Sequence, residues 1–116
     1  MTDIREYLAR KPLLFDGGMG TYYKAKPGTE CEQGNLLDPA GVRKVHREYL
    51  AAGAEAIKTN TFGLPRMAAA RQPDWQALAR AGWKLAAEAA VETGAAVFAD
   101  LGPPDTEAAP AGSIYT

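Results

Sequence analysis

Polar residues and glycines follow three short apolar segments of the chain, at residues 16–20, 59–63 and 102–103. These residue types can do binding chemistry, because the carboxylate of Asp16 accepts hydrogen bonds from an ammonium group, and hydroxyl and backbone N–H groups donate to a carboxylate. Each group also has a purely structural interpretation. Asp16 suits a turn or a helix cap, and residues 59–61 could satisfy the backbone of their own loop.

The single cysteine and the single histidine offer weaker chemistry. Cys31 would need a neighbouring base to act as a nucleophile, and no histidine is placed to serve it. One thiol also forms neither an internal disulfide nor a thiolate zinc site, which needs three or four protein ligands. His46 falls on the apolar stripe of an expected helix, so we expect a packed structural histidine.

Charge and hydropathy argue against two classes of partner. The 116 residues carry 13 Lys and Arg against 14 Asp and Glu, so no basic excess is available to neutralise a nucleic-acid backbone. No apolar run approaches the roughly 18 to 20 residues of a membrane span, and residues 1–11 do not resemble a signal peptide. A lone cysteine fits a reducing compartment, and we expect a cytoplasmic protein.

Predicted helices alternate with the three apolar segments. Residues 38–53 give the clearest helix, because Asp38 can cap it, Pro39 suits its first turn and apolar residues recur at helical spacing. Further helices are predicted at residues 2–10, 66–71 and 74–94, and a long loop at residues 21–37. The apolar segments are predicted strands, at residues 13–15, 54–59 and 95–101.

The spacing of the predicted strands indicates parallel pairing. They start about every 41 residues with a helix between them, and antiparallel neighbours would not need such crossovers. The joins from helix to strand at Gly53 and Gly94 are minimal, whereas the joins from strand to helix are long and polar. Both the open doubly wound sheet and the (β/α)8 barrel place function at the carboxyl ends of such strands.

The first glycine-rich segment favours the barrel. A dinucleotide fingerprint needs G-x-G-x-x-G leading directly into a helix, but Tyr23 stands where the third glycine belongs, and no P-loop follows. Because eight barrel units take about 250 residues, we predict an α/β fold made of the first three βα units of an incomplete (β/α)8 TIM barrel. Leu, Ile, Val and Phe total only 20 residues against 23 Ala, which agrees with a piece that does not close its own core.

Four segments of the chain form a recognisable set: residues 13–21 (LLFDGGMGT), 45–54 (VHREYLAAGA), 58–63 (KTNTFG) and 97–103 (VFADLGP). Together they resemble the amino-terminal part of the homocysteine S-methyltransferase family, most closely the homocysteine-binding module of cobalamin-dependent methionine synthases, and residues 110–113 extend the methionine-synthase likeness. The resemblance implies that residues 1–116 are the first part of a barrel that transfers a methyl group to the homocysteine thiol, giving methionine. It also implies a zinc ion held by three cysteines of later strands, which lowers the thiol pKa and so generates the attacking thiolate.

The resemblance also implies which residues contact the amino-acid part of homocysteine. By position these are Asp16, Gly17, Thr59, Asn60, Thr61 and Phe62. Gly102 and Pro103 would line the same mouth. No catalytic residue and no metal ligand is assigned to this chain, because Cys31 matches no zinc position of the family. The methyl donor is left open, with methylcobalamin as one candidate.

Two other functions remain open from the sequence. A non-catalytic partial barrel would pair its open edges with another copy of the chain or with the remainder of a split protein, which the thin aliphatic composition favours. A small-molecule binding module without methyl chemistry would instead bind an amino acid or a phosphate without zinc. These alternatives differ in what they bind, so they can be separated experimentally.

Overall fold

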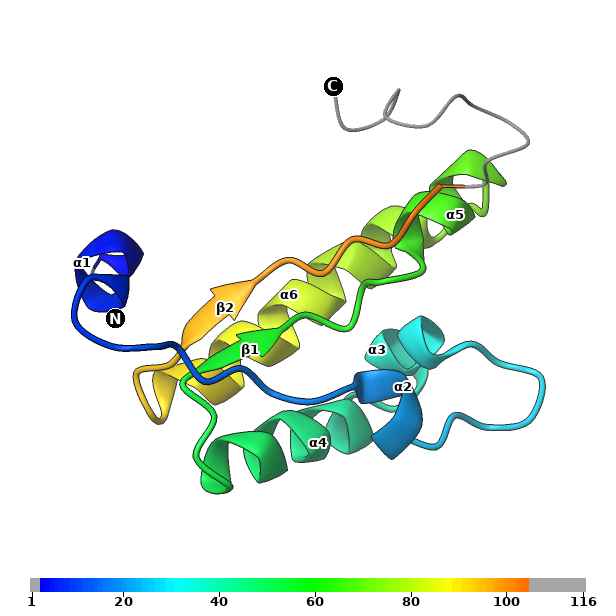
Figure 1. Ribbon diagram of the computed structural model, residues 1–116. Coiled ribbons are helices and arrows are strands. Elements are labelled where there is room, and N and C mark those ends of the chain that lie inside the picture. The colour runs from blue at the N-terminus through cyan, green and yellow to red at the C-terminus, as the bar shows by residue number, and fades with distance from the viewer. Residues whose placement is uncertain (1–2, 105–116) are drawn as a thin grey trace.

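The computed structural model describes residues 3–104, in which helices alternate with parallel strands (Figure 1). The elements in chain order are α1 (Ile4–Leu8), α2 (Met19–Tyr22), the 3-10 helix η1 (Cys31–Gln33), α3 (Gly34–Leu37), α4 (Pro39–Ala51), β1 (Ala56–Lys58), α5 (Leu64–Ala69), α6 (Trp75–Val91) and β2 (Ala96–Phe98). The predicted α/β class and the order of the main helices are confirmed. Residues 110–113 lie outside the described part, and no described helix is long and apolar enough to cross a membrane.

The sheet is smaller than the sequence predicts. β1 and β2 pair in parallel, but the first predicted strand is reduced to one parallel bridge between Phe15 and Ala56. The Asp16 N–H donates to the Ala56 carbonyl, and the Ala56 N–H donates to the Leu14 carbonyl. The described residues therefore contain a two-stranded sheet with a third segment running beside β1, and the predicted count of three strands is not confirmed.

Two acidic side chains explain why the bridge does not extend into a strand. The Leu14 N–H donates to Glu55 Oε1 at 3.1 Å, and the Lys58 N–H donates to Asp16 Oδ2 at 3.1 Å. These are the backbone donors that a longer ladder between the two segments would use. Carboxylate oxygens replace the backbone carbonyls on both sides of the bridge, so the segment leaves the ladder after one residue pair.

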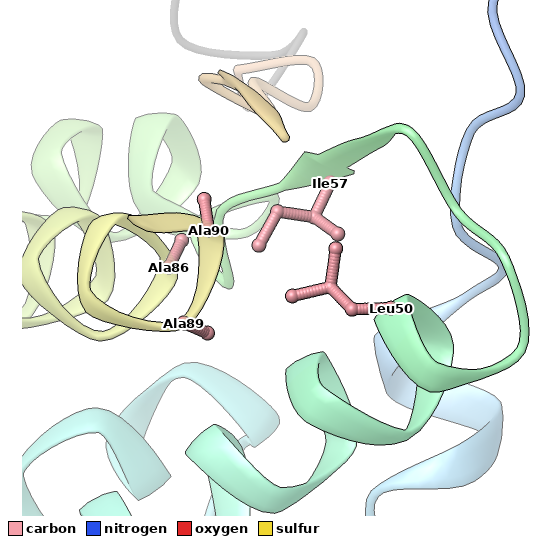
Figure 2. Packing of buried hydrophobic residues seen from close by; sticks show 5 residues of the cluster. All are labelled: Leu50, Ile57, Ala86, Ala89 and Ala90. Atoms are coloured by element: carbon pink, nitrogen blue, oxygen red, sulfur yellow. The ribbon is translucent and has the colours of Figure 1, made fainter. Parts of the chain in front are cut away.

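Helices α4 and α6 cover one face of the sheet, and we call this the helix face. Ile57 points from β1 into a cluster with Leu50 of α4 and three alanines of α6, Ala86, Ala89 and Ala90 (Figure 2). Ile57 is fully buried. The alanines let α6 lie close to the strands, so a small number of large aliphatic residues is enough to fill this layer.

The ends of α4 follow from its sequence as predicted. The Asp38 side chain accepts from the Gly41 N–H, and Pro39 occupies the first turn, where its missing N–H has no helical partner. Gly53 and Gly94 both have positive φ, at 110° and 76°. Such a backbone suits glycine because it has no Cβ, and it turns the chain from helix to strand in very few residues.

The predicted loop at residues 21–37 is wrong in detail. Helix α2 extends into it, and η1 and α3 occupy residues 31–37. A capping box starts η1: Glu30 accepts from the Gln33 backbone, and the Gln33 side chain accepts from the Glu30 N–H at 2.7 Å. These elements are too short to show a helical period of apolar residues in the sequence. The capping residues Glu30 and Gln33 were the one available signal for them.

Candidate functional site

The polar segments that follow β1 and β2 meet at one end of the sheet. They border a cavity of about 220 Å³, which we call the mouth cavity. Its lining comes from four parts of the chain: Gly18, Met19, Gly20, Cys31, Glu32, Thr59, Asn60, Thr61, Phe62 and Asp100. The structure therefore brings together Thr59, Asn60, Thr61 and Phe62 of the predicted site, at the carboxyl end of β1 where parallel folds bind their ligands.

Two threonines join the ends of the two strands through a closed set of hydrogen bonds. The Asp100 N–H donates to Thr59 Oγ1 at 3.2 Å, and Thr61 Oγ1 donates to the Asp100 carbonyl at 2.7 Å. The two hydroxyl oxygens lie 2.6 Å apart, so the Thr59 hydroxyl donates to Thr61. Both threonines are buried, and this arrangement fixes the loop after β1 against the segment after β2.

Asn60 ties the same loop to the segment around η1. Its Nδ2 donates to the Cys31 carbonyl and to Asn35 Oδ1, each at 3.0 Å, and its Oδ1 accepts from the Cys31 thiol at 3.3 Å. Asn35 Nδ2 donates to the carbonyls of Asn60 and Leu78 at 2.8 and 3.1 Å. Because both amides are buried and fully bonded, Asn60 is held rigidly and Asn35 is a main organiser of the site.

Glycine at position 82 of α6 allows this arrangement. A Cβ there would lie 2.7 Å from Asn35 Nδ2 and 2.9 Å from Thr61 Cγ2, which is closer than side chains tolerate. Helix α6 can therefore pack directly under the buried amides only because residue 82 has no side chain. The site depends on this helix as well as on the loops that line the cavity.

Phe62 and Glu32 form contrasting walls of the mouth cavity. Phe62 is 54% exposed, so its ring is available to a ligand rather than used in the core. The Glu32 carboxylate is buried and accepts from the Gly63 N–H at 3.2 Å. The Phe62 carbonyl in turn accepts from the Gly102 N–H at 2.8 Å, which joins the predicted mouth residue Gly102 to the same loop.

Asp16 and Gly17, the other two predicted contacts, are not part of the cavity lining. The Asp16 side chain is only 3% exposed and forms an ion pair with Lys58, its Oδ1 lying 2.7 Å from Nζ. Gly17 faces Tyr49: a Cβ would lie 2.8 Å from the Tyr49 hydroxyl, which donates to the Gly18 carbonyl at 2.8 Å. These two residues support the edge of the cavity from behind.

Burial raises the pKa values of two ionisable groups that line the cavity. It raises the pKa of the Cys31 thiol to about 11, with a further contribution from the negative charge of Glu32, so the thiol is protonated at neutral pH. Burial also raises the pKa of Asp100; Lys58 opposes that shift and Asp16 adds to it. A protonated, hydrogen-bonded thiol is a poor nucleophile, which agrees with the structural interpretation of Cys31.

His46 is a packed residue of the helix layer. It is fully buried on the inward side of α4, and neither ring nitrogen has a hydrogen-bond partner among the described residues. Burial lowers its pKa, although the charge of Asp16 acts in the opposite direction. The predicted packing of this histidine is confirmed, and its neutral ring belongs to the helix layer.

The residues present do not fit a zinc ion. Within residues 3–104 no three His, Cys, Asp or Glu side chains gather in a way that could hold a metal. The chain has one cysteine, and its thiol is already bonded to Asn60. The described residues around the mouth cavity present amides, hydroxyls, an aromatic ring and charged side chains.

Sequence reasoning missed Glu32, Asn35, Lys58 and Asp100. Glu32 and Asn35 belong to a segment without an apolar period, and they act through contacts with residues 25 or more positions away. Lys58 and Asp100 each lie inside a segment that carries the family resemblance, at a strand end, so their position was the one available signal. Position alone does not say which side chain pairs with which.

The arrangement of these elements matches a known class of fold. The homocysteine methyltransferase MmuM from Escherichia coli, solved in its metallated form, superposes with a TM-score of 0.70 over 97% of this chain and 45% of its own, at 24% sequence identity. The likeness shows that the chain has the α/β fold of part of a homocysteine methyltransferase TIM barrel, with the mouth cavity at the carboxyl ends of its strands.

The sequence comparison identifies the family. The family described as homocysteine S-methyltransferase matches residues 13–115, so the chain belongs to the homocysteine S-methyltransferase family. Methionine synthases of Mycobacterium tuberculosis and Mycobacterium leprae are each 37% identical to it over 71 residues. These matches cover 53% of this chain and 6% of either relative, so the chain spans a small part of their length.

Proposed function

We propose that this chain supplies the substrate-binding loops of a homocysteine S-methyltransferase, which transfers a methyl group to the homocysteine thiol and forms methionine. The observation that carries the proposal is the mouth cavity, where Thr59, Asn60, Thr61 and Phe62 converge at the carboxyl end of β1. Membership of the family supports the reaction class. The cavity combines polar and aromatic groups, which suits an amino acid with a short thiol side chain.

The six residues have different roles in this proposal. The hydrogen-bonded segment of Thr59, Asn60 and Thr61 forms the polar wall of the cavity beside the amino-acid end of homocysteine, and the exposed ring of Phe62 covers its carbon chain. Asp16, whose side chain is only 3% exposed, orients Lys58 beside the cavity. Gly17 leaves room for Tyr49, which holds the backbone beside the cavity.

The metal and the methyl donor lie outside this assignment. In the complete barrel a zinc ion would be bound by cysteines that this chain does not contain, and no step of the reaction is assigned to its one thiol. Methylcobalamin stays one candidate donor. We also propose the cytoplasm as the location, because Cys31 is a free thiol.

Binding of homocysteine to the 116-residue chain tests the proposal. Phe62→Ala removes an exposed ring from the cavity and is expected to weaken binding several-fold with little effect on folding. Leu37→Ala is the matched control, because Leu37 is 59% exposed and is not in the cavity lining. Chemical-shift titration by NMR measures both affinities. Equal affinities for the Phe62→Ala variant and the unmodified chain would contradict the assignment.

Zinc titration tests whether the metal is bound by residues that this chain does not contain. The proposal predicts no tight, stoichiometric binding of zinc by the chain with homocysteine present, because it lacks the three thiolates. The Cys31→Ser variant controls for a weak contribution of the single thiol. A tight complex that Cys31→Ser abolishes would show that this chain holds the metal itself.

A second candidate function is that of a partial barrel that assembles with another copy or with the rest of the barrel. A second groove of about 380 Å³ favours it, lying between α5, α6 and residues 99–101 and lined mainly by apolar side chains such as Leu64, Trp75, Trp83 and Leu101. Trp83 and Leu101 are 50% and 57% exposed there. Sedimentation velocity on the purified chain would show dimers or larger species, and a stable compact monomer would contradict this candidate.

A further inference from the structure

Lys58 lies at the carboxyl end of β1 and donates three hydrogen bonds to Asp16. Its Nζ donates to Asp16 Oδ1 at 2.7 Å and to the Asp16 carbonyl at 3.2 Å. The Lys58 backbone N–H donates to Asp16 Oδ2 at 3.1 Å. The lysine therefore fixes the orientation of the carboxylate on both oxygens, and the pair behaves as one unit.

One of the three N–H groups of the Lys58 ammonium is not bonded to Asp16. An ammonium has three N–H groups, and two of them are used on Asp16. In residues 3–104 no other acceptor lies within hydrogen-bond distance of Nζ. The Lys58 side chain is 33% exposed while that of Asp16 is 3% exposed, so the accessible part of the ion pair is its positive end.

Lys58 lies beside the mouth cavity. The next residue, Thr59, lines the cavity, as does Gly18, two residues after Asp16. Nζ lies 5.6 Å from the centre of the Phe15 ring, which borders the charge on one side without accepting a conventional hydrogen bond. Asp100, a residue of the cavity lining, interacts electrostatically with both Lys58 and Asp16.

We propose that Lys58 binds the carboxylate of the amino-acid substrate through its third N–H, as a specificity-determining residue beside the mouth cavity. The proposal rests on the proposed function, because it takes the substrate to be an α-amino acid. Such a molecule carries a negatively charged carboxylate. The ammonium of Lys58 is the accessible end of the ion pair and is held in place by Asp16, so it is positioned to pair with that carboxylate.

A purely structural ion pair makes a different prediction. If Lys58 serves only to neutralise Asp16, its removal affects folding and all ligands alike. If it binds the substrate carboxylate, its removal affects only ligands that carry a carboxylate. Ligand chemistry therefore distinguishes the two roles even where the fold becomes less stable.

The test compares homocysteine with 3-aminopropane-1-thiol, which lacks the carboxylate, by NMR titration of the 116-residue chain and its Lys58→Gln variant. Glutamine keeps a donor for Asp16 but has no charge. We expect Lys58→Gln to weaken homocysteine binding about fivefold, as one partly exposed charge pair contributes, and to leave binding of 3-aminopropane-1-thiol within twofold. Lys58→Arg is expected to restore the preference for homocysteine. Lys44→Met, which removes an exposed charge on α4, is the remote control.

Each outcome of this titration either supports or overturns the proposed role of Lys58. An equal loss for both ligands, or no loss for either, would overturn the role of Lys58 while leaving the proposed function in place. If Lys58→Gln does not fold, the unmodified chain still decides: it must bind homocysteine more tightly than 3-aminopropane-1-thiol, and equal affinities overturn the proposal. Absence of homocysteine binding by the unmodified chain would overturn the proposed function, and this inference with it.

Discussion

The two faces of the small sheet are built from opposite kinds of residue. On the helix face, Ile57 and the alanines of α6 pack without exposed area (Figure 2). On the other face, which we call the inner face, the tilted rings of Phe15 and Phe98 contact each other with ring centres 4.9 Å apart, and Lys58 lies on the same face beside Phe98. Phe15 is 41% exposed. Alternation along β1 therefore places the packed core on one side and the residues of the proposed recognition site on the other.

This difference indicates how the segment divides its tasks. The helix face is closed by α4 and α6, which the chain itself supplies (Figure 1). The inner face would be the interior of a complete barrel, and a charged residue there is tolerated because it lies at the open end and pairs with Asp16. Substitutions on the two faces are thus expected to differ in both size and kind of effect.

The largest effect is expected from Ile57→Ala on the helix face. Ile57 is fully buried between α4 and α6, so a truncation leaves a cavity and lowers the free energy of unfolding by about 2 to 5 kcal/mol. Urea denaturation followed by circular dichroism measures the change. Val91→Ala is the control on α6, since Val91 is 82% exposed and its truncation should change stability by less than about 0.5 kcal/mol. Similar losses for the two variants would contradict a closed helix face.

Gly82→Ala is expected to have the next largest effect, because it acts through the helix face on the mouth cavity. The new Cβ would press on Asn35 and Thr61, and such overpacking lowers stability by about 1 to 3 kcal/mol. The amide resonances of residues 59–62 should shift with it. Gly20→Ala is the matched control, because a Cβ there meets no atom within 4 Å. Unchanged resonances of residues 59–62 in the Gly82→Ala variant would show that the packing of α6 does not affect the site.

Phe15→Ala on the inner face is expected to have a smaller effect on stability, about 1 kcal/mol, because the ring is only partly buried. Its main consequence should be seen in assembly. If the inner face contacts another copy or the remainder of the barrel, loss of the ring reduces any self-association that sedimentation velocity detects. A loss of stability as large as that of Ile57→Ala would show that the two faces do not differ as described.

The smallest effect concerns pH and His46. Burial lowers the pKa of this residue below its ordinary 6.5, so below pH 6.5 the unfolded chain takes up a proton that the folded chain excludes. Stability therefore falls as pH decreases, with a contribution of at most about 1.4 kcal/mol per pH unit from this one group. His46→Leu should remove that part of the dependence. Parallel curves for the variant and the unmodified chain between pH 7 and 5 would contradict it.

The sequence was sufficient to predict the parts of the fold that depend on local chemistry. Helix α4 was predicted from its Asp38 cap and its apolar period, and both Gly53 and Gly94 adopt the backbone that such tight joins require. The first predicted strand, at residues 13–15, is longer than the single bridge that the structure contains. Its ladder is replaced by bonds to the Glu55 and Asp16 side chains, and no periodicity reveals a competition between side-chain and backbone acceptors.

The site was predictable only where a motif lay at a strand end. Thr59 to Phe62 do line one cavity, because the end of a parallel strand determines where the following loop begins. Asn35 and Lys58 depend on partners 25 and 42 residues away, and those contacts exist only once the chain has folded. Asp16 shows the same limit: its place after the first apolar segment could be read from the sequence, but its burial against Lys58 could not.

The central claim is that the mouth cavity recognises the amino-acid part of homocysteine, without metal, while the helix face serves only packing. The most direct measurement is an NMR titration of the 15N-labelled chain with homocysteine in a metal-free buffer. The account predicts shifts for backbone amides of residues 17–20 and 59–63, and none for the exposed side of α4 around Lys44. No shift at the mouth cavity, or shifts concentrated on α4, would contradict it.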